Sequence, residues 1–343
     1  MKALLMTRPG EFAFEERPKP VPKNDEVLFR ILNVGICGSD FHAFGGTQPF
    51  FTYPRVTGHE LVVEAAEIPS SARGAASTYK EGDILSLLPY IYCGKCISCR
   101  RGKPNSCTHL KVLGVHMDGG MQEYLCLPAH YGIPAPGLKP LDIALIECFA
   151  IGFHGAARAD PRPGEAALVA GTGPIGIGII HGLKERGAKV IAMDINEKRL
   201  NYAKEIARAD YIINSQKSDP EEALGDITGG EYAPLVIDAT GNAGQMMKAF
   251  DYVSAGGSIV YVGLVREEIC FQDPVLHAKE ITLKASRNAT REDFENVIAA
   301  IKSGRVNTAG FVSHRAALDE VPDKFTSWTK PEEGCIKAVI SIA

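Results

Sequence analysis

The chain has 343 residues, of which 45% are hydrophobic and 23% are charged, a composition typical of a folded globular protein. Its 37 basic and 41 acidic side chains leave a formal net charge of -4, which supplies no strong field for holding nucleic acid or an anionic membrane. The length exceeds that of one compact core and predicts two domains of ordinary size. We therefore expect a protein that acts on small molecules.

The amino-terminal segment and the apolar runs predict a protein that is neither exported nor membrane-spanning. Arg8, Glu11 and Glu15 interrupt the first segment before an apolar core can form, so no secretory signal is expected. The most apolar stretch, residues 166–182, is broken by glycines and Pro174. Five of the nine cysteines are widely scattered, which fits a reducing compartment better than a disulfide framework. The sequence thus predicts a cytoplasmic protein.

The first part of the chain consists of short strand-like runs separated by glycine and proline, and it contains candidate metal ligands. Cys37 lies in the segment 35–42, and His59 and Glu60 follow Gly58. Any one of these residues is more often a packed core residue than a ligand. Neighbouring residues of a strand point in opposite directions, so His59 and Glu60 can reach one ion only if the backbone turns there. Gly58 makes such a turn possible.

Four cysteines farther along the chain have the spacing of a metal site. Two-residue gaps separate Cys93, Cys96 and Cys99, and Cys107 follows after a longer gap. This spacing lets a looping backbone place four thiolates around one Zn2+ ion. A disulfide pair would require an oxidising compartment, and a ferredoxin-type cluster would have a shorter final gap followed by proline, whereas Thr108 follows here. Because four thiolates fill a tetrahedral ion, we expect a structural zinc that takes no part in chemistry.

The middle of the chain begins with the pattern of a dinucleotide-binding turn. After an apolar run at residues 166–170, the chain reads Gly171, Thr172, Gly173, Pro174, Ile175 and Gly176. A helix is expected next, over residues 177–186. In such a site the first glycine makes the tight turn, the second admits the pyrophosphate, and the third lets the helix pack on the strand. The amino terminus of the helix then faces the phosphates.

A second strand, predicted over residues 189–193, ends in Asp194. An acidic residue about 20 positions past the glycines accepts hydrogen bonds from the ribose hydroxyls and repels a 2'-phosphate, so NAD is favoured over NADP. Lys198 and Arg199 lie nearby and leave NADP open; Arg199 is also a candidate cofactor contact.

The alternation of helices and strands continues beyond this point. Helices are expected over residues 197–207 and 220–228, and strands over residues 211–214, 235–238 and 258–263. This periodicity predicts a doubly wound parallel sheet. Thr240 and Gly263 lie at the ends of strands, where a cofactor binds, although a glycine in that place is also typical of a turn.

These motifs together resemble those of the zinc-dependent medium-chain alcohol dehydrogenase family, and the resemblance covers nearly the full length. Five motifs occur in order: the segment 35–42, Gly58-His59-Glu60, the four cysteines, Glu147 and the glycine turn. The family resemblance implies an α/β protein in which a Rossmann domain, residues 149–285, is inserted in a GroES-like β-barrel catalytic domain. That domain would comprise residues 1–148, with the zinc lobe at about 90–110, and residues 286–343. NAD, two zinc ions per chain and a homodimer or homotetramer are also implied.

The resemblance further implies a catalytic zinc held by Cys37, His59 and a glutamate, with one position open for the substrate oxygen. Glu60 and Glu147 are both candidates, one as ligand and the other as its neighbour, and the sequence ranks neither. Family members usually have proline after the second glutamate, whereas this chain has Cys148, interpreted as a small buried hydrophobic residue or a spare ligand.

The implied reaction is oxidation of a secondary alcohol, with zinc as Lewis acid and NAD+ as hydride acceptor. Ser39 is similar to the relay hydroxyl of the family, and His42 is the expected end of the proton path to solvent. Alternatively, both residues cap the helix that follows Cys37.

The substrate expectation depends on local similarity to the aldonate-oxidising members of the family. The similar segments are residues 41–56, 113–120 and 286–290. They indicate a sugar acid of the L-galactonate or L-gulonate type, oxidised at C5. The polar side chains available for a carboxylate and hydroxyls are Gln48, Arg55, His116 and Arg287. Arg287 is equally a candidate cofactor contact. Polyol or L-threonine oxidation and a non-catalytic zinc protein that binds NAD are the alternatives.

Overall fold

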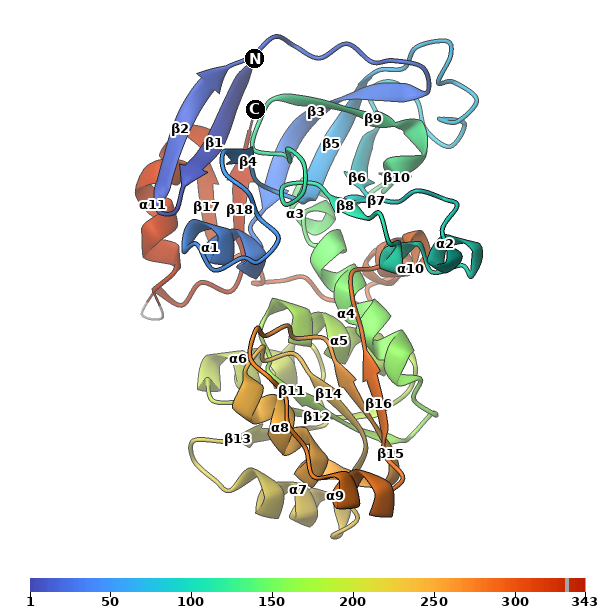
Figure 1. The fold of residues 1–343 in the computed structure, drawn as a ribbon, viewed down its shortest axis with the longest axis vertical. Helices are drawn as coiled ribbons and strands as arrows, with labels where there is room; N and C mark the ends of the chain where they lie inside the picture. Colours follow the sequence, from blue (N-terminus) through green and yellow to red (C-terminus); the bar gives the residue numbers. More distant parts are fainter. Residues whose placement is uncertain (331–332, 343) are drawn as a thin grey trace. The chain divides into compact units, whose positions relative to one another are not determined.

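The computed structural model describes residues 1–330 and 333–342, and the chain divides into two units (Figure 1). The first unit contains Met1–Glu147, Thr290–Ser303 and, from Thr308 on, the rest of the described chain. The second unit contains Cys148–Ala289 and Gly304–Asn307. The second unit is therefore an insertion in the first.

The first unit is built mainly from strands. They are β1 (Lys2–Arg8), β2 (Glu11–Glu16), β3 (Glu26–Gly35), β4 (Arg55–Val56), β5 (Glu60–Glu67), β6 (Ile84–Leu87), β7 (Tyr90–Ile91), β8 (Lys111–Val112), β9 (Tyr124–Pro128), β10 (Gly132–Pro134), β17 (His314–Ala317) and β18 (Ala338–Ser341). The largest sheet has the order β10-β6-β5-β3-β18-β17, with β9 also paired to β3. A smaller sheet has the order β2-β1-β4, and β7 and β8 form a ribbon of their own. Valine, leucine and isoleucine make up five of the ten residues of β3, as expected for a strand with paired neighbours on both edges.

The helices of the first unit are short. They are α1 (Gly38–Phe44), α2 (Ile97–Arg100), α3 (Pro140–Ile143), α10 (Arg291–Lys302), α11 (Val321–Trp328) and the 3-10 turns η1 (Pro104–Ser106), η2 (Ala129–Tyr131) and η3 (Leu318–Glu320). The ring of Phe325 on α11 lies 5.0 Å from the rings of both Phe41 and Phe44 on α1. This aromatic cluster fixes α1, whose amino terminus carries Cys37.

The second unit is a parallel sheet with helices between its strands (Figure 1). Its strands are β11 (Ala166–Ala170), β12 (Lys189–Asp194), β13 (Tyr211–Asn214), β14 (Ala233–Asp238), β15 (Val253–Tyr261) and β16 (Thr282–Ala285). Its helices are α5 (Pro174–Glu185), α6 (Glu197–Glu205), α7 (Pro220–Thr228), α8 (Ala243–Tyr252) and α9 (Asp273–Ala278), and α4 (Ile146–Ala159) enters it from the first unit. The sheet order β13-β12-β11-β14-β15-β16 confirms the predicted doubly wound fold.

The predicted elements of the second unit differ from the observed ones mainly at their ends. The helix expected from residue 177 begins at Pro174, because proline lacks the N–H that the first helical position leaves unpaired. The strand expected from residue 258 begins earlier, at Val253. Beyond β16 the backbone still bonds to this unit, since the N–H of Ser286 donates to the carbonyl of Tyr261 at 2.8 Å.

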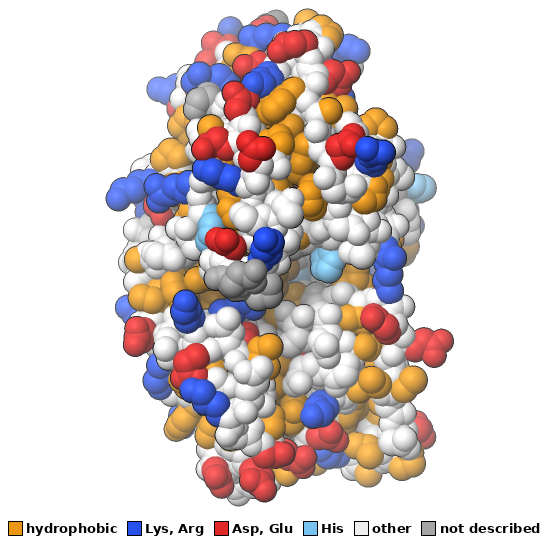
Figure 2. Space-filling view, turned by 90° about the vertical axis from the view of Figure 1, so that its left-hand side faces the viewer, with side chains coloured by type: hydrophobic (Ala, Val, Ile, Leu, Met, Phe, Trp, Pro, Cys, Tyr) orange, Lys and Arg blue, Asp and Glu red, His pale blue; other side chains and the backbone are white. Residues whose placement is uncertain are grey.

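Among the described helices, none combines the length and the apolar character that a bilayer crossing requires. On the face shown in Figure 2, lysine and arginine side chains are interspersed with aspartate and glutamate. This mixture agrees with the small net charge of -4.

Candidate metal centres and nucleotide site

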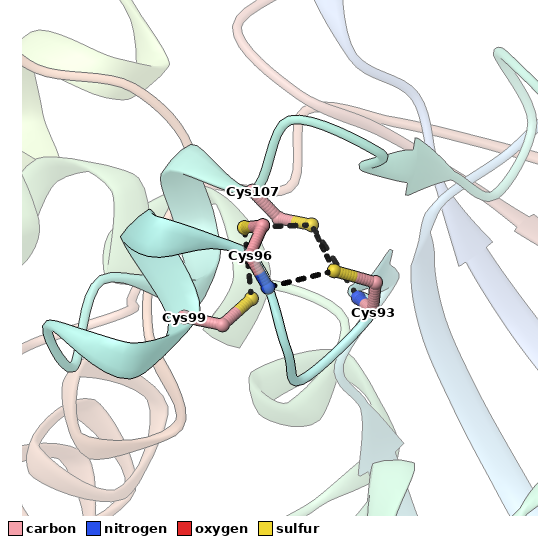
Figure 3. Close-up of side chains that lie close together, drawn as sticks. All are labelled: Cys93, Cys96, Cys99 and Cys107. Carbon is pink, nitrogen blue, oxygen red and sulfur yellow. Dashed lines mark hydrogen bonds between the residues drawn. The ribbon is translucent and has the colours of Figure 1, made fainter.

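The four predicted cysteines converge in one loop of the first unit. Figure 3 shows their side chains pointing toward one another from the loop between β7 and β8. The four sulfur atoms all lie within 4.8 Å of one another. The closest sulfur pairs are 3.5 Å apart, well beyond the length of a disulfide bond, and all nine cysteines are free thiols.

Backbone N–H groups of the loop donate hydrogen bonds to several of these sulfurs. The N–H of Cys96 donates to Cys93 Sγ at 3.4 Å, and the N–H of His109 donates to Cys107 Sγ at 3.3 Å. The N–H groups of Cys99 and Thr108 lower the pKa of the Cys96 thiol to about 5. The loop therefore offers four sulfur ligands in the arrangement expected for a closed zinc site.

A second cluster joins Cys37, His59 and Glu60. One ligand atom of each lies within 4.8 Å of the others, and His59 and Glu60 are buried. Cys37 is the residue before α1, and Glu60 is the first residue of β5. Gly58 has a φ of +96°, so the backbone turns directly before His59, which lets both neighbouring side chains reach one point.

The sheet leaves little space around Glu60. Gly35, the last residue of β3, pairs with Glu60 across the antiparallel ladder. A Cβ atom at position 35 would lie 2.1 Å from Glu60 Oε2 and 2.9 Å from Glu60 Cβ, so any larger residue there would displace Glu60. Cys37 follows two residues later in the chain, and this strand end therefore positions both candidate ligands.

Each of the two candidate glutamates has its own buried partner, and the sequence predicted neither partner. The ammonium of Lys337 donates to Glu60 Oε1 at 2.6 Å and to Oε2 at 2.8 Å. The hydroxyl of Tyr90 donates to Glu147 Oε1. The position of Lys337 directly before the apolar strand β18 is a weak sequence indication that this lysine is buried. No sequence pattern distinguishes Tyr90, which precedes the four-cysteine loop.

Several buried polar atoms of this region lack a hydrogen-bond partner among the described residues. They are His59 Nδ1, Glu147 Oε2 and Ser39 Oγ. A buried nitrogen and a buried carboxylate oxygen without partners are costly unless something else binds them. The thiol, imidazole and carboxylate groups of Cys37, His59 and the two glutamates are of the ligand types that zinc prefers.

Charges in the cluster perturb one another. Burial opposes protonation of His59, but the hydrogen bond to Cys37 and the charges of Cys37, Asp40 and Glu147 raise its pKa well above the usual range. Burial raises the pKa of Glu147 to about 7. The charge of His59 opposes this rise, and the charge of Glu60 adds to it. Burial and the Glu147 charge raise the pKa of Tyr90, so its hydroxyl stays a donor. Because the charges of Glu147, His59 and Glu60 affect one another, the carboxylate of Glu147 lies near the cluster of Cys37, His59 and Glu60.

Helix α1 carries both predicted relay residues. Cys37, not Ser39 or His42, is the N-cap, and its N–H donates to Asp40 Oδ2 at 2.9 Å. His42 is exposed and its Nδ1 lies 3.0 Å from the hydroxyl of Thr47. The capping alternative therefore does not describe Ser39 or His42. Cys148, on α4, is fully buried, as a small hydrophobic residue would be.

The glycine turn of the second unit has the expected shape. Gly171 has a φ of +89°, and Gly173 is the N-cap of α5. A Cβ atom at Gly176 would lie 1.9 Å from the carbonyl oxygen of Gly171, so the helix can approach the strand only with glycine here. The turn and the following amino terminus of α5, with Pro174 and Ile175 in its first turn, form a cradle that fits a dinucleotide phosphate.

Two aspartates lie at the carboxyl ends of β12 and β14, the strands on either side of β11. Asp194 Oδ2 accepts hydrogen bonds from the N–H and the hydroxyl of Thr172, at 2.7 and 2.9 Å, and thereby ties the turn to β12. Asp238, which the sequence reading missed, is fully buried and accepts the hydroxyl of Thr240 at 2.9 Å. Burial raises the pKa of Asp238 to about 6. A Cβ at Gly263 would lie 2.5 Å from the N of Gly241, so the backbones pack closely there.

The candidate substrate residues fall in both units. In the first unit Gln48 Oε1 accepts the N–H of Phe50, whose ring stacks on His116 with centroids 6.0 Å apart. Arg55 instead donates to the hydroxyl of Thr52 at 2.8 Å. Arg287 is exposed and belongs to the second unit, as does the half-buried Arg199 on α6.

Comparisons with known proteins agree with this architecture. Residues 23–137 match the alcohol dehydrogenase GroES-like domain, and residues 174–303 match the zinc-binding dehydrogenase family. The chain is 38% identical to L-galactonate-5-dehydrogenase of Escherichia coli K12, over 99% of both chains. It is 31% identical to a sorbitol dehydrogenase of Halalkalibacterium halodurans, over 93% of this chain and 94% of the other. The crystal structure of the alcohol dehydrogenase RspB from E. coli CFT073, complexed with NADH, superposes with a TM-score of 0.92 at 30% identity, covering 100% of this chain and 99% of the other.

With an inserted doubly wound unit, a GroES-like unit and two clusters of zinc-type ligands, the chain belongs to the zinc-dependent medium-chain alcohol dehydrogenase family. It is an oxidoreductase that acts on the CH–OH group of a small alcohol or polyol.

Proposed function

We propose that this dehydrogenase oxidises a secondary hydroxyl of a sugar acid, of the L-galactonate or L-gulonate type at C5, with NAD+ as acceptor. The observation that supports this choice of substrate is the 38% identity with L-galactonate-5-dehydrogenase over 99% of both chains. A sugar acid has one anionic group and several hydroxyls, so its binding requires a cation and polar side chains.

Two zinc ions per chain fit the two clusters. Cys93, Cys96, Cys99 and Cys107 would hold the structural ion, and Cys37, His59 and Glu60 or Glu147 would hold the catalytic one. Zinc supplies Lewis-acid polarisation of the substrate hydroxyl, and NAD+ supplies the hydride acceptor. The buried atoms of His59 and Glu147 that lack hydrogen-bond partners among the described residues support a metal site here, because such atoms are costly unless an ion or ligand binds them.

The residues of α1 give the substrate proton a path. The hydroxyl of Ser39 is buried and has no partner among the described residues, and it can accept a proton from a substrate hydroxyl and pass it on. His42 is exposed on the same helix, and an imidazole releases protons near neutral pH. Lys337 holds Glu60 by both oxygens, so that carboxylate keeps one orientation.

The proposed nucleotide contacts follow the carboxyl ends of the strands of the parallel sheet in the second unit. The proposed contacts are Gly171, Gly173, Pro174, Ile175, Gly176, Asp194, Arg199, Thr240, Gly263 and Arg287. Asp194 supports NAD over NADP, because its carboxylate would repel a 2'-phosphate. Its present bonds to Thr172 keep that carboxylate next to the glycine turn.

Gln48 and His116 in the first unit and Arg287 in the second are the proposed substrate contacts. An arginine fork binds a carboxylate through two charge-assisted bonds, so Arg287→Ala should reduce kcat/KM for an aldonate by about 1.5 to 3 kcal/mol. A neutral polyol should lose much less. Parallel losses for both substrates would assign Arg287 to the cofactor instead.

Polyol oxidation is the second candidate, favoured by the 31% identity with a sorbitol dehydrogenase. The deciding experiment is NADH production by the zinc-loaded protein with L-galactonate, L-gulonate, sorbitol, L-threonine and a simple alcohol. We expect the highest kcat/KM for the two aldonates. Turnover of sorbitol or threonine without turnover of either aldonate would refute the sugar-acid assignment and leave the dehydrogenase class intact.

A further inference from the structure

The strand that opens the four-cysteine loop also reaches the second cluster. Tyr90 on β7 lies three residues before Cys93, and β8 begins four residues after Cys107. The ribbon pairs Tyr90 with Val112 and Ile91 with Lys111. The loop and the ribbon therefore hold the backbone of Tyr90 from both sides.

The side chain of Tyr90 is fixed as well. Tyr90 is 2% exposed, and its ring packs edge-on against that of Phe294, with centroids 6.4 Å apart and planes at 84°. Its hydroxyl donates to Glu147 Oε1. Glu147 is also 2% exposed, and its other oxygen, Oε2, has no partner among the described residues.

These contacts give the two carboxylate oxygens of Glu147 different tasks. Oε1 is held by a neutral donor, and Oε2 is left buried with its lone pairs unused. Glu60 differs, because the ammonium of Lys337 binds both of its oxygens. The unpartnered oxygen of the pair therefore belongs to Glu147.

We propose that Tyr90 is a positioning residue that orients Glu147 Oε2 toward the metal bound by Cys37 and His59. The inference rests on the proposed function, since it assumes that this cluster binds a metal. Without the Tyr90 hydroxyl, Glu147 can rotate and both of its oxygens lose their fixed directions. Partners of this kind change metal affinity by about 10- to 100-fold.

The test uses the full-length protein that retains its loop zinc and measures Co2+ binding to the second cluster by optical titration. Tyr90→Phe should weaken Co2+ binding by about 10-fold and shift the cobalt ligand-field bands. Tyr131→Phe is the matched control, because Tyr131 is equally buried and its hydroxyl accepts the N–H of Tyr92 in the same region without touching Glu147. This control should leave both the affinity and the bands unchanged.

A double-mutant cycle separates positioning from general loosening. In a Glu147→Gln background, Tyr90→Phe should have little further effect on Co2+ affinity, because the group through which Tyr90 acts is altered. Equal tenfold losses with and without Glu147→Gln would overturn the inference, as would unchanged affinity and bands in Tyr90→Phe. If the unmodified protein binds no metal beyond the loop ion, the proposed function itself fails and the inference fails with it.

Discussion

The two clusters of candidate metal ligands in the first unit are assembled in different ways. The four cysteines come from a single loop, three of them half-exposed, and they bind one another and the backbone of the loop. The residues of the second cluster come from separate segments and are positioned by distant partners; Lys337 reaches Glu60 across 277 residues. The first cluster is thus a property of local spacing, whereas the second is a property of the completed fold.

Exchanging one ligand in each cluster should give the sharpest contrast. Cys37→Ala should retain the loop zinc and the fold but lose about 1000-fold or more in turnover, since several kcal/mol of charge stabilisation disappear. Cys96→Ala should lose the loop zinc and much of the stability of the first unit, because binding of a structural metal contributes to folding. Zinc content per chain, melting temperature and NADH production measure the difference. A fully active protein with one zinc ion per chain would contradict the assignment of two separate roles.

Lys337→Met tests whether the second cluster depends on its distant partner. The change leaves the carboxylate of Glu60 buried without its cation, which should reduce the free energy of unfolding by about 3 to 5 kcal/mol in the metal-free protein. Urea denaturation measures this loss. Lys324→Met is the control, because Lys324 pairs with Glu320 at 2.7 Å on an exposed helix face, and its removal should change stability little. Equal losses in the free energy of unfolding for the two substitutions would show that burial of the Lys337–Glu60 pair does not increase its contribution to stability.

Gly35→Ala and Gly94→Ala test how tightly the backbone packs around each of the two clusters. A Cβ at position 35 would lie 2.1 Å from Glu60 Oε2, so Gly35→Ala should displace Glu60, cost about 1 to 3 kcal/mol in stability and reduce Co2+ binding at the second cluster. A Cβ at Gly94 meets no atom within 4 Å, and only its φ of +70° is unfavourable for alanine, at about 1 to 2 kcal/mol. The loop should therefore keep its zinc in Gly94→Ala. Loss of the loop metal there would mean that the cysteine cluster is less self-contained than its geometry indicates.

The sequence predicted the parts of the molecule in which neighbours in the chain are also neighbours in space. The glycine turn, β12 and Asp194 form one continuous segment, and the doubly wound sheet followed from the same alternation. Lys337 and Tyr90 were missed for a physical reason: their roles depend on hydrogen bonds to residues far away in the chain, and a single lysine or tyrosine has no periodic pattern. The bonds of Asp194 to Thr172 were also outside the prediction, because a motif states which residues are present and not which of them bind one another before a ligand arrives.

The interrupted arrangement of the first unit has a consequence for the order in which the protein is made. A ribosome that has translated as far as Asn307 has produced every residue of the second unit. The first unit, although its largest segment is translated before the second unit, still lacks β17, β18 and Lys337 at that moment. Since domains fold as units once their residues are available, the nucleotide-type sheet is complete first. The nascent chain then carries Glu60 without its cation until the last strands are synthesised.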